Sequence, residues 1–194
     1  MGKPTFTVVD SHIELPLPLY ESHIVGLVNL PDGEVLSVYA GLSKEHVEKL
    51  QAHARDMEDV ELQNNTSDYR RFVENSYEDW YKKERTPFAL IGANGQLAAL
   101  IWFGPEKMPI ESDTDSWDTV AFRSYAPYRG KGIMTPFGLF AISKYIELRP
   151  GRSIWLETGP SNEAAVHLYK KLGFTEHSYQ GHADRLLMTF TEPV

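Results

Sequence analysis

The chain has 194 residues, of which 42% are hydrophobic and 24% charged, a composition typical of one soluble globular domain with a good-sized core. Its formal net charge of −8 argues against general nucleic-acid binding and mildly favours cationic substrates. The absence of cysteine excludes disulfides, thiolate metal sites and a cysteine acyl-enzyme, and fits a cytoplasmic protein. We expect no membrane association, because no apolar run approaches the roughly 18 residues of a membrane span and the first six residues carry neither a signal-peptide core nor a myristoylation motif.

The first 40 residues predict an extended segment followed by a β-hairpin. Residues 1–22 alternate poorly between apolar and polar side chains and include prolines, so we expect an extended lead-in. Residues 23–30 and 34–40 are β-like, and the Pro-Asp-Gly sequence at 31–33 favours a turn between them.

Two amphipathic helices are expected next. Ser43 can cap the first helix, whose apolar residues fall on one face: Val47, Leu50, Ala54 and Met57. The second is expected over residues 67–83 and carries an aromatic stripe at helical spacing: Tyr69, Phe72, Tyr77 and Trp80. Such a stripe is more often core than ligand site, although some of these rings could face a substrate.

A second hairpin and a polar loop are predicted in the middle of the chain. Residues 88–93 and 96–103 flank Asn94-Gly95, a strong hairpin signal. Residues 104–116 form a polar loop with an acidic cluster: Glu111, Asp113 and Asp115. We interpret the cluster as a solvated tip, with an amine-attracting rim as the alternative.

Residues 128–135 (Tyr-Arg-Gly-Lys-Gly-Ile-Met-Thr) separate a predicted strand, residues 117–125, from a segment with a helix-like apolar stripe. This arrangement is suited to holding a phosphate. The two glycines let backbone N–H groups close on an anion without an intervening Cβ. The start of the helix adds unpaired N–H donors and the positive end of its dipole, while Arg129 and Lys131 add charge.

The spacing of this loop chooses between the known phosphate motifs. A Walker loop fails because Tyr125 stands where its first glycine belongs, and a dinucleotide-binding Gly-x-Gly-x-x-Gly fails at Thr135. An Arg-x-x-Gly-x-Gly/Ala pattern fits from Arg129, with Met134 the one departure. This stretch resembles the coenzyme A pyrophosphate loop of the GNAT superfamily of N-acetyltransferases; an ordinary surface turn is the alternative.

Residues 155–174 (Trp-Leu-Glu-Thr-Gly-Pro-Ser-Asn-Glu-Ala-Ala-Val-His-Leu-Tyr-Lys-Lys-Leu-Gly-Phe) resemble the second GNAT signature. That signature is a strand, an Asn-initiated helix carrying a Tyr, and a Leu-Gly-Phe exit. Local physics agrees, because Asn162 is a good N-cap and Gly173 a good residue to end the helix.

Taken together, the two stretches identify the chain as a member of the GNAT superfamily, and the resemblance implies its fold. We expect a mixed α+β fold with a central, mostly antiparallel mixed sheet that is splayed between its fourth and fifth strands and flanked by helices. The final strands are expected at 174–178 and 186–190. The whole chain, 1–194, is expected to be one acetyltransferase domain, with 1–41 as an N-terminal extension and hairpin and 117–176 as the acetyl-CoA-binding core.

The resemblance also implies a catalytic base. An alkyl amine with a pKa of about 10.4 is mostly protonated at neutral pH, so deprotonating it costs roughly 4–5 kcal/mol. Ribosomal-protein N-terminal acetyltransferases of this superfamily place a base Glu at the position of Glu157, in a Trp-Leu-Glu-x-x-x-Ser-Asn motif, although Gly159 replaces their Arg or Lys. A structural or substrate-orienting Glu157 is the alternative.

Tyr169 is the predicted general acid, which protonates the departing coenzyme A thiolate. It follows Asn162 by two helical turns, and GNAT members carry a Tyr at this position near the sulfur. A phenol with a pKa near 10 keeps its proton at neutral pH and can donate it. A packed core Tyr is the alternative.

Coenzyme A contacts are implied for the strand end, the loop and the helix cap: Phe122, Arg123, Ser124, Arg129, Gly130, Lys131, Gly132, Ile133, Met134, Thr135 and Asn162. Those of the strand end depend on backbone groups, which pair with pantetheine and orient the acetyl carbonyl. Thr135-Pro136 could start the helix and so lengthen the loop. The seven histidines show no metal-ligand spacing, so we expect no metal.

The predicted function is therefore acetyl-CoA-dependent N-acetyl transfer in a ternary complex, to a small amine or a peptide amine, by a cytoplasmic enzyme. Alternatives are another acyl donor, an oxygen acceptor, or a GNAT-like domain that binds acyl-CoA as a sensor or scaffold without turnover. The oligomeric state stays open, with a homodimer as one alternative.

Overall fold

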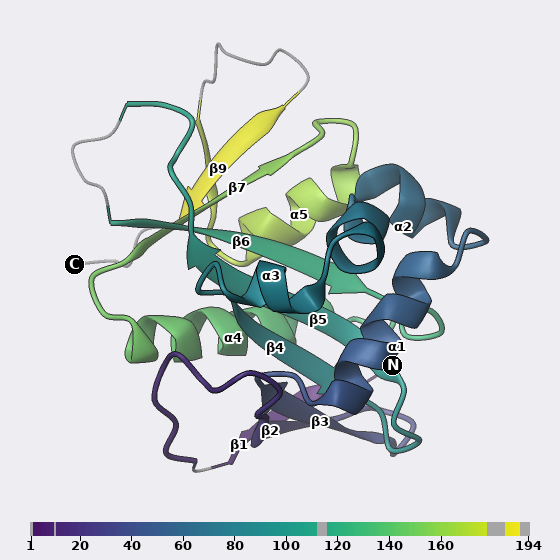
Figure 1. Cartoon of the computed structure of the whole chain (residues 1–194). Coiled ribbons are helices and arrows are strands. Elements are labelled where there is room, and N and C mark those ends of the chain that lie inside the picture. Colours follow the sequence, from purple (N-terminus) through teal and green to yellow (C-terminus); the bar gives the residue numbers. More distant parts are fainter. Residues whose placement is uncertain (1, 10, 112–115, 178–184, 191–194) are drawn as a thin grey trace.

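The computed structural model describes residues 2–9, 11–111, 116–177 and 185–190. Within them, nine strands form one sheet in the order β1-β2-β3-β4-β5-β6-β7-β9-β8, in which only β6 and β7 are parallel neighbours (Figure 1). The strands are β1 Thr5–Val8, β2 His23–Asn29, β3 Val35–Ala40, β4 Thr86–Ile91, β5 Leu97–Pro105, β6 Trp117–Ser124, β7 Ser153–Thr158, β8 Thr175–His177 and β9 Leu186–Phe190. The helices are α1 Lys44–Arg55, α2 Val60–Asn65, the π-helix η1 Arg70–Glu74, α3 Tyr77–Tyr81, α4 Met134–Leu148 and α5 Glu163–Lys171.

Helices cover both faces of the sheet, with α1, η1 and α3 on one face and α4 and α5 on the other. The strands bury side chains on both faces because each face has its own core. Along β5, Ile101 and Phe103 join the core under α4 and α5, while Leu100 and Trp102 join the aromatic core under α1, η1 and α3. The predicted mixed α+β fold with a mostly antiparallel sheet is confirmed.

The N-terminal lead-in is more ordered than its sequence suggests. Residues 5–8 form β1, which pairs antiparallel with β2, so the extended lead-in predicted over 1–22 contains a strand that was not predicted. The strand is short and mostly exposed, so it lacks the apolar alternation that reveals a strand in a sequence. Its anchor is Phe6, which stacks on Phe140 of α4 with ring centroids 4.4 Å apart. The hairpin of β2 and β3 is confirmed.

The first predicted helix is confirmed as α1, with Ser43 accepting a hydrogen bond from the backbone N–H of His46. Met57 lies beyond its end and is exposed, so it does not belong to the buried face. The second predicted helix, over 67–83, is instead broken into η1 and α3. Asn75 and Ser76 adopt extended backbone between them, and the Ser76 hydroxyl caps α3 by accepting from the N–H of Asp79. The short helix α2 was not predicted.

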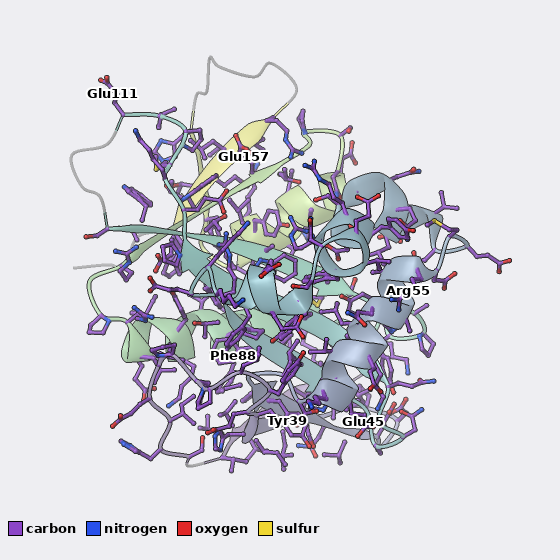
Figure 2. All side chains as sticks on the ribbon, viewed as in Figure 1. Tyr39, Glu45, Arg55, Phe88, Glu111 and Glu157 are labelled. Atoms are coloured by element: carbon purple, nitrogen blue, oxygen red, sulfur yellow. The ribbon has the colours of Figure 1, made fainter. Side chains whose placement is uncertain are left out.

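The remaining predicted elements are close to those observed. The hairpin around Asn94-Gly95 is confirmed as β4 and β5, and β8 and β9 lie where the final strands were expected, apart from residue 178, which is outside the described residues. Of the acidic cluster, Glu111 is exposed at the loop shown in Figure 2. Its partners Asp113 and Asp115 lie outside the described residues.

The splay expected between the fourth and fifth family strands occurs between β6 and β7. These strands pair only over Trp117–Thr119 and Ser153–Trp155, although both continue further. Buried Asp118 stabilises the paired end. Its carboxylate accepts from the Arg152 Nε at 2.9 Å and from the Tyr145 hydroxyl at 2.7 Å, which ties β6 to the start of β7 and to α4.

We expect Asp118→Asn to lower the free energy of unfolding by about 2–3 kcal/mol, because Arg152 loses the charge of its buried partner. Urea denaturation measures this loss. Glu147→Gln is the matched control, since Glu147 pairs with Lys144 on the exposed surface of α4 and its removal should change stability by under about 0.5 kcal/mol. Equal effects of the two substitutions would show that Asp118 is not a special anchor.

Candidate active site

A cleft of about 1710 Å³ opens where β6 and β7 separate, bounded by the starts of α4 and α5 and by the region of α2 and η1. It is lined by the predicted site residues, with the exception of Lys131: Phe122, Arg123, Ser124, Arg129, Gly130, Gly132, Ile133, Met134, Thr135, Glu157, Asn162 and Tyr169. The fold therefore brings together in one cavity residues as far apart in the sequence as Phe122 and Tyr169, which are 47 positions apart.

The glycine-rich loop has the backbone geometry of an anion cradle. Gly130 and Gly132 have φ angles of +77° and +73°, a conformation that residues with a Cβ rarely adopt. Among the described residues, the N–H groups of Gly130, Gly132 and Ile133 make no hydrogen bond, whereas that of Lys131 donates to the Tyr128 carbonyl. The loop thus presents unused donors to the cleft.

The helix after the loop begins at Met134, with Ile133 as an N-cap that has no side-chain hydrogen bond. The helix thus starts two residues before Pro136, the later start that the sequence allowed, and the loop is not lengthened. The side chain of Met134 packs against the core. Met134, the one departure from the family pattern, also lines the cleft. The open first turn of α4 adds N–H donors and the positive end of the helix dipole.

Both cations of the loop face carboxylates in this structure. Two nitrogens of Arg129 donate to the two oxygens of Asp59, each at 2.7 Å, and its Nε donates to the Ser124 carbonyl at 2.8 Å. Lys131 points outside the cleft, with its Nζ 3.9 Å from a Glu34 oxygen. Their contact with a phosphate stays a prediction, and an incoming anion would compete with Asp59 for Arg129.

The end of β6 offers backbone groups on its open side. Beyond Thr119 the strand has no partner on the β7 side, while Arg123 and Ser124 still pair with β5 on the other. The Phe122 carbonyl accepts a hydrogen bond from the Arg123 Nη1 at 2.8 Å, and the Ser124 carbonyl accepts one from the Arg129 Nε. The predicted pantetheine contacts remain untested.

Tyr169 lies on the α5 side of the cleft. Asn162 caps α5 by accepting from the Ala165 N–H at 3.2 Å, as predicted. The Tyr169 side chain is 9% exposed, and its ring centroid lies 5.2 Å from that of Phe122. Burial raises the pKa of Tyr169, against an opposing effect of Arg123, so its hydroxyl stays protonated at neutral pH. This is the state that a general acid requires.

Glu157 projects from β7 into the same cleft (Figure 2). Its Oε1 is buried, and within the described part of the chain it has no hydrogen-bond partner. An unsatisfied buried acceptor costs about 1–3 kcal/mol. The site therefore contains a carboxylate oxygen that a bound donor could satisfy, and an amine is such a donor.

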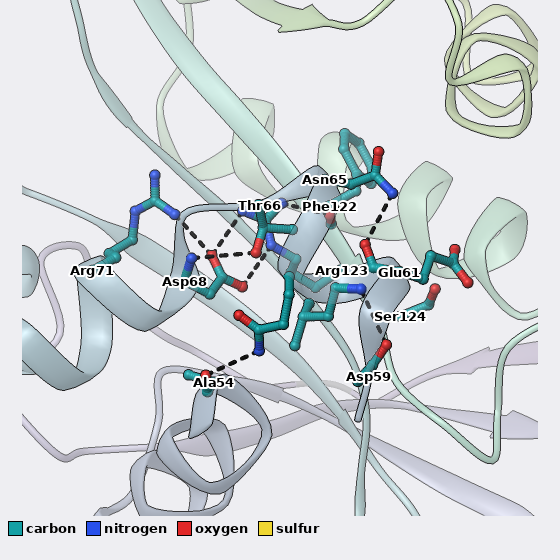
Figure 3. Close-up of polar contacts among 12 residues, drawn as sticks. Ala54, Asp59, Glu61, Asn65, Thr66, Asp68, Arg71, Phe122, Arg123 and Ser124 are labelled. Carbon is teal, nitrogen blue, oxygen red and sulfur yellow. Dashed lines mark hydrogen bonds and ion pairs between the residues drawn. The ribbon is translucent and has the colours of Figure 1, made fainter. Parts of the chain in front are cut away.

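Sequence reasoning missed a buried ion-pair cluster on the opposite side of β6 from Tyr169. Asp68, 2% exposed, accepts from the Arg123 Nε and Nη2 at 2.7 and 2.9 Å and from the Arg71 Nη1 at 2.8 Å (Figure 3). The Arg123 guanidinium also lies 4.7 Å from the ring centroid of Trp102. One signal was available: an arginine beside Val120, Ala121 and Phe122 within a strand needs a partner for its charge when it is buried.

No group of three or more potential metal ligands gathers anywhere in the described residues. Over the same residues, none of the helices has the length and hydropathy needed to cross a membrane.

The Arg129–Asp59 pair predicts a pH-dependent effect on stability. The hydrogen bond that the Asp59 carboxylate accepts from Arg129 lowers the pKa of Asp59. The ionised carboxylate therefore stabilises the fold above the unfolded pKa of about 3.9, and this contribution is lost as the pH falls through the lower folded-state pKa. Asp59→Asn preserves a cap for α2, so we expect a loss of about 1–2 kcal/mol at pH 7 that disappears in strong acid.

Urea denaturation of the wild type and Asp59→Asn between pH 7 and pH 2 measures this difference. Glu61→Gln is the control, because the exposed Glu61 lies 3.6 Å from the same guanidinium and should contribute under about 0.5 kcal/mol. A deficit of Asp59→Asn that persists unchanged at pH 2 would contradict the assignment to the ion pair.

Comparisons with known proteins agree with this geometry. A family model described as the acetyltransferase (GNAT) family matches residues 52–174, while no curated protein matches. The GNAT domain of PAT from S. lividans is 19% identical, with a TM-score of 0.62 over 84% of this chain and 94% of that chain. Spermidine N-acetyltransferase from Vibrio cholerae, solved with CoA and spermine, is 17% identical, with a TM-score of 0.53 over 79% and 92%. Ribosomal-protein-S5-alanine acetyltransferase from Vibrio fischeri is 14% identical, with a TM-score of 0.55 over 79% and 92%.

Since the matched family region covers more than half of the chain and includes the whole loop, β7 and α5, this protein belongs to the acetyltransferase (GNAT) family.

Proposed function

We propose that this protein is an N-acetyltransferase that moves an acetyl group from acetyl-CoA to a primary amine by direct transfer in a ternary complex. The observation that carries the proposal is convergence: an anion-binding loop, an open strand edge, a protonated phenol and an unsatisfied carboxylate all line the one cleft between β6 and β7. The acceptor is a small amine or a peptide amine. A relative of similar fold was solved with CoA and a polyamine, which supports the class of reaction.

The donor side of the site would hold coenzyme A along residues 117–176, within the single domain of the chain. The free N–H groups of Gly130 and Gly132 and the first turn of α4 suit a pyrophosphate. From there the open edge of β6, ending at Ser124, suits the amide groups of a pantetheine arm, since these pair as a strand would. Asn162 faces the same space from the start of α5.

The proposed chemistry uses one proton acceptor and one proton donor. Glu157, directly or through water, removes the proton of the bound ammonium, and the neutral amine nitrogen then attacks the thioester carbonyl carbon and forms the new C–N bond. The surplus proton that remains on this nitrogen passes to water. Collapse of the tetrahedral intermediate breaks the C–S bond, and the departing thiolate takes the proton of Tyr169. A base is needed because deprotonation costs roughly 4–5 kcal/mol for an alkyl amine, against about 1 for an α-amine.

Acetyl-CoA binding tests the donor site by calorimetric titration. We expect micromolar binding by the wild type and about 100-fold weaker binding by Gly132→Glu, because the new carboxylate repels the pyrophosphate and fills the loop. Gly151→Glu is the matched control: Gly151 has a similar φ of +79° and open space around it but lies outside the cleft. No binding by the wild type, or equal loss in both variants, would overturn the proposed donor site.

Substitutions of the two proposed proton-transfer residues should have different kinetic effects. Tyr169→Phe keeps the ring that packs on Phe122, so we expect kcat to fall about 10²–10³-fold while the Kd for acetyl-CoA stays within about twofold. Glu157→Gln should lower kcat/KM most at neutral pH and recover as the pH approaches the amine pKa, because hydroxide then does the work of the base.

Thiol release and mass spectrometry of the product measure both effects. Unchanged turnover in Tyr169→Phe would assign that residue to packing alone. Tight acetyl-CoA binding without turnover on any amine or alcohol would favour the non-catalytic sensor instead.

A further inference from the structure

An arginine cluster forms the wall of the cleft on the side of η1 and α3, across from the coenzyme A loop. It consists of Arg71 and Arg123, whose guanidinium groups lie over the ring of Trp102 in β5, and of Arg85, whose charge acts on Arg71. The carboxylates bonded to these arginines are Asp68, which is buried, and Glu106, which is half-exposed. Three cations against two carboxylates make this wall positive, although the chain as a whole carries a net charge of −8.

Each nitrogen of Arg123 already donates to an acceptor within the protein. Its Nε and Nη2 donate to Asp68, and its Nη1 donates to the Phe122 carbonyl. Its guanidinium plane also lies against Trp102. Arg123 is therefore a fixed part of the wall, held by the same carboxylate that contacts its neighbour Arg71.

Arg71 has donors left over. Among the described residues, only its Nη1 makes a hydrogen bond, to Asp68 at 2.8 Å, and the rest of the guanidinium points away from that carboxylate (Figure 3). The side chain is 30% exposed, so these donors can be reached from the cleft. Burial lowers the pKa of Arg71, and the nearby charges of Arg123 and Arg85 act in the same direction. An anion beside it would relieve this repulsion.

Arg85 adds further unused donors behind Arg71. Its Nη2 donates to Glu106 at 3.0 Å, but its Nε and Nη1 are buried without a partner within the described residues. The side chain is 10% exposed and lines the cleft. Buried guanidinium nitrogens without acceptors are costly, and a negative charge bound beside this wall would offset part of that cost.

We propose that the acceptor amine carries a carboxylate, and that Arg71, supported by Arg85, binds it. The inference rests on the proposed function and names its acceptor class. A guanidinium fork matches a carboxylate in a bidentate geometry, while Glu157 on β7 receives the amine end. The acceptor therefore spans the cleft with its amine toward Glu157 and its carboxylate toward Arg71. A polyamine would instead place a second positive charge against the arginines.

Matched acceptor pairs test this inference: an amino acid and its carboxamide, for several side chains, with spermidine as a polycationic acceptor. Thiol release gives kcat/KM, and mass spectrometry identifies the product. We expect the wild type to prefer each free carboxylate by about 10- to 100-fold. Arg71→Gln should remove that preference, mainly by raising the KM for the amino acid with the free carboxylate. The KM for acetyl-CoA should not change.

Two further variants keep the test specific. Arg71→Gln leaves Asp68 paired with Arg123, so the fold should hold, and Arg71→Lys retains the charge without the fork and should give an intermediate preference. Arg55→Gln removes an equal charge from the exposed end of α1, outside the cleft, and should change nothing (Figure 2). Calorimetric titration of the amino acid into the CoA-bound wild type and Arg71→Gln adds a readout independent of turnover.

The outcomes separate the two proposals. Preference for the carboxamide or spermidine, or a carboxylate preference that survives in Arg71→Gln, would overturn the inference while leaving acetyl transfer intact. Carboxylate binding that depends on Arg71 without any acetylation would retain the subsite and overturn the proposed function. If no acceptor is acetylated and the amino acid does not bind, both proposals are overturned.

Discussion

The structure depends on where β6 and β7 stop pairing. Asp118 joins Arg152 and Tyr145 at the paired end, and the parallel ladder lasts only from Trp117 to Thr119. Beyond that point, within the described part of the chain, β6 pairs with no strand on the β7 side. A sheet that paired along its full length would fill this space with backbone hydrogen bonds and leave no cleft. A buried ion pair is a suitable anchor here, because its geometry is more specific than that of apolar packing.

The alternation of side chains along β6 divides the cleft into two chemically different halves. Phe122 points to the α5 side, where it contacts Tyr169, and the neighbouring Arg123 points to the other side, where it contacts Asp68 and Trp102. The protonated phenol and the arginine wall are thus held by successive residues of one strand. A shift of one residue in the register of β6 against β5 would exchange the two halves. Strand register is therefore a condition for the whole site.

The sequence predicts the parts of this site that are local and misses those that depend on distant contacts. The glycine loop, the Asn162 cap and the exit at Gly173 have their causes within a few residues, so pattern reasoning finds them. The partner of Arg129 cannot be found in this way, because Asp59 is 70 positions away, at the N-cap of a helix too short to show a period. The break between η1 and α3 was missed for a related reason: aromatic spacing continues across it, while the Ser76 cap that interrupts the helix is a single residue.

The electrostatic character of the cleft also could not be read from composition. A net charge of −8 suggests a cationic substrate if the charges are spread evenly, yet a substrate responds to the charges within a Debye length of its own groups. In the cleft, the buried Asp68 is shared between two arginines, and Arg85 keeps unpaired nitrogens. Asp68 and Glu106 offset only part of the charge of the three arginines, so a carboxylate of the ligand would stabilise this wall further.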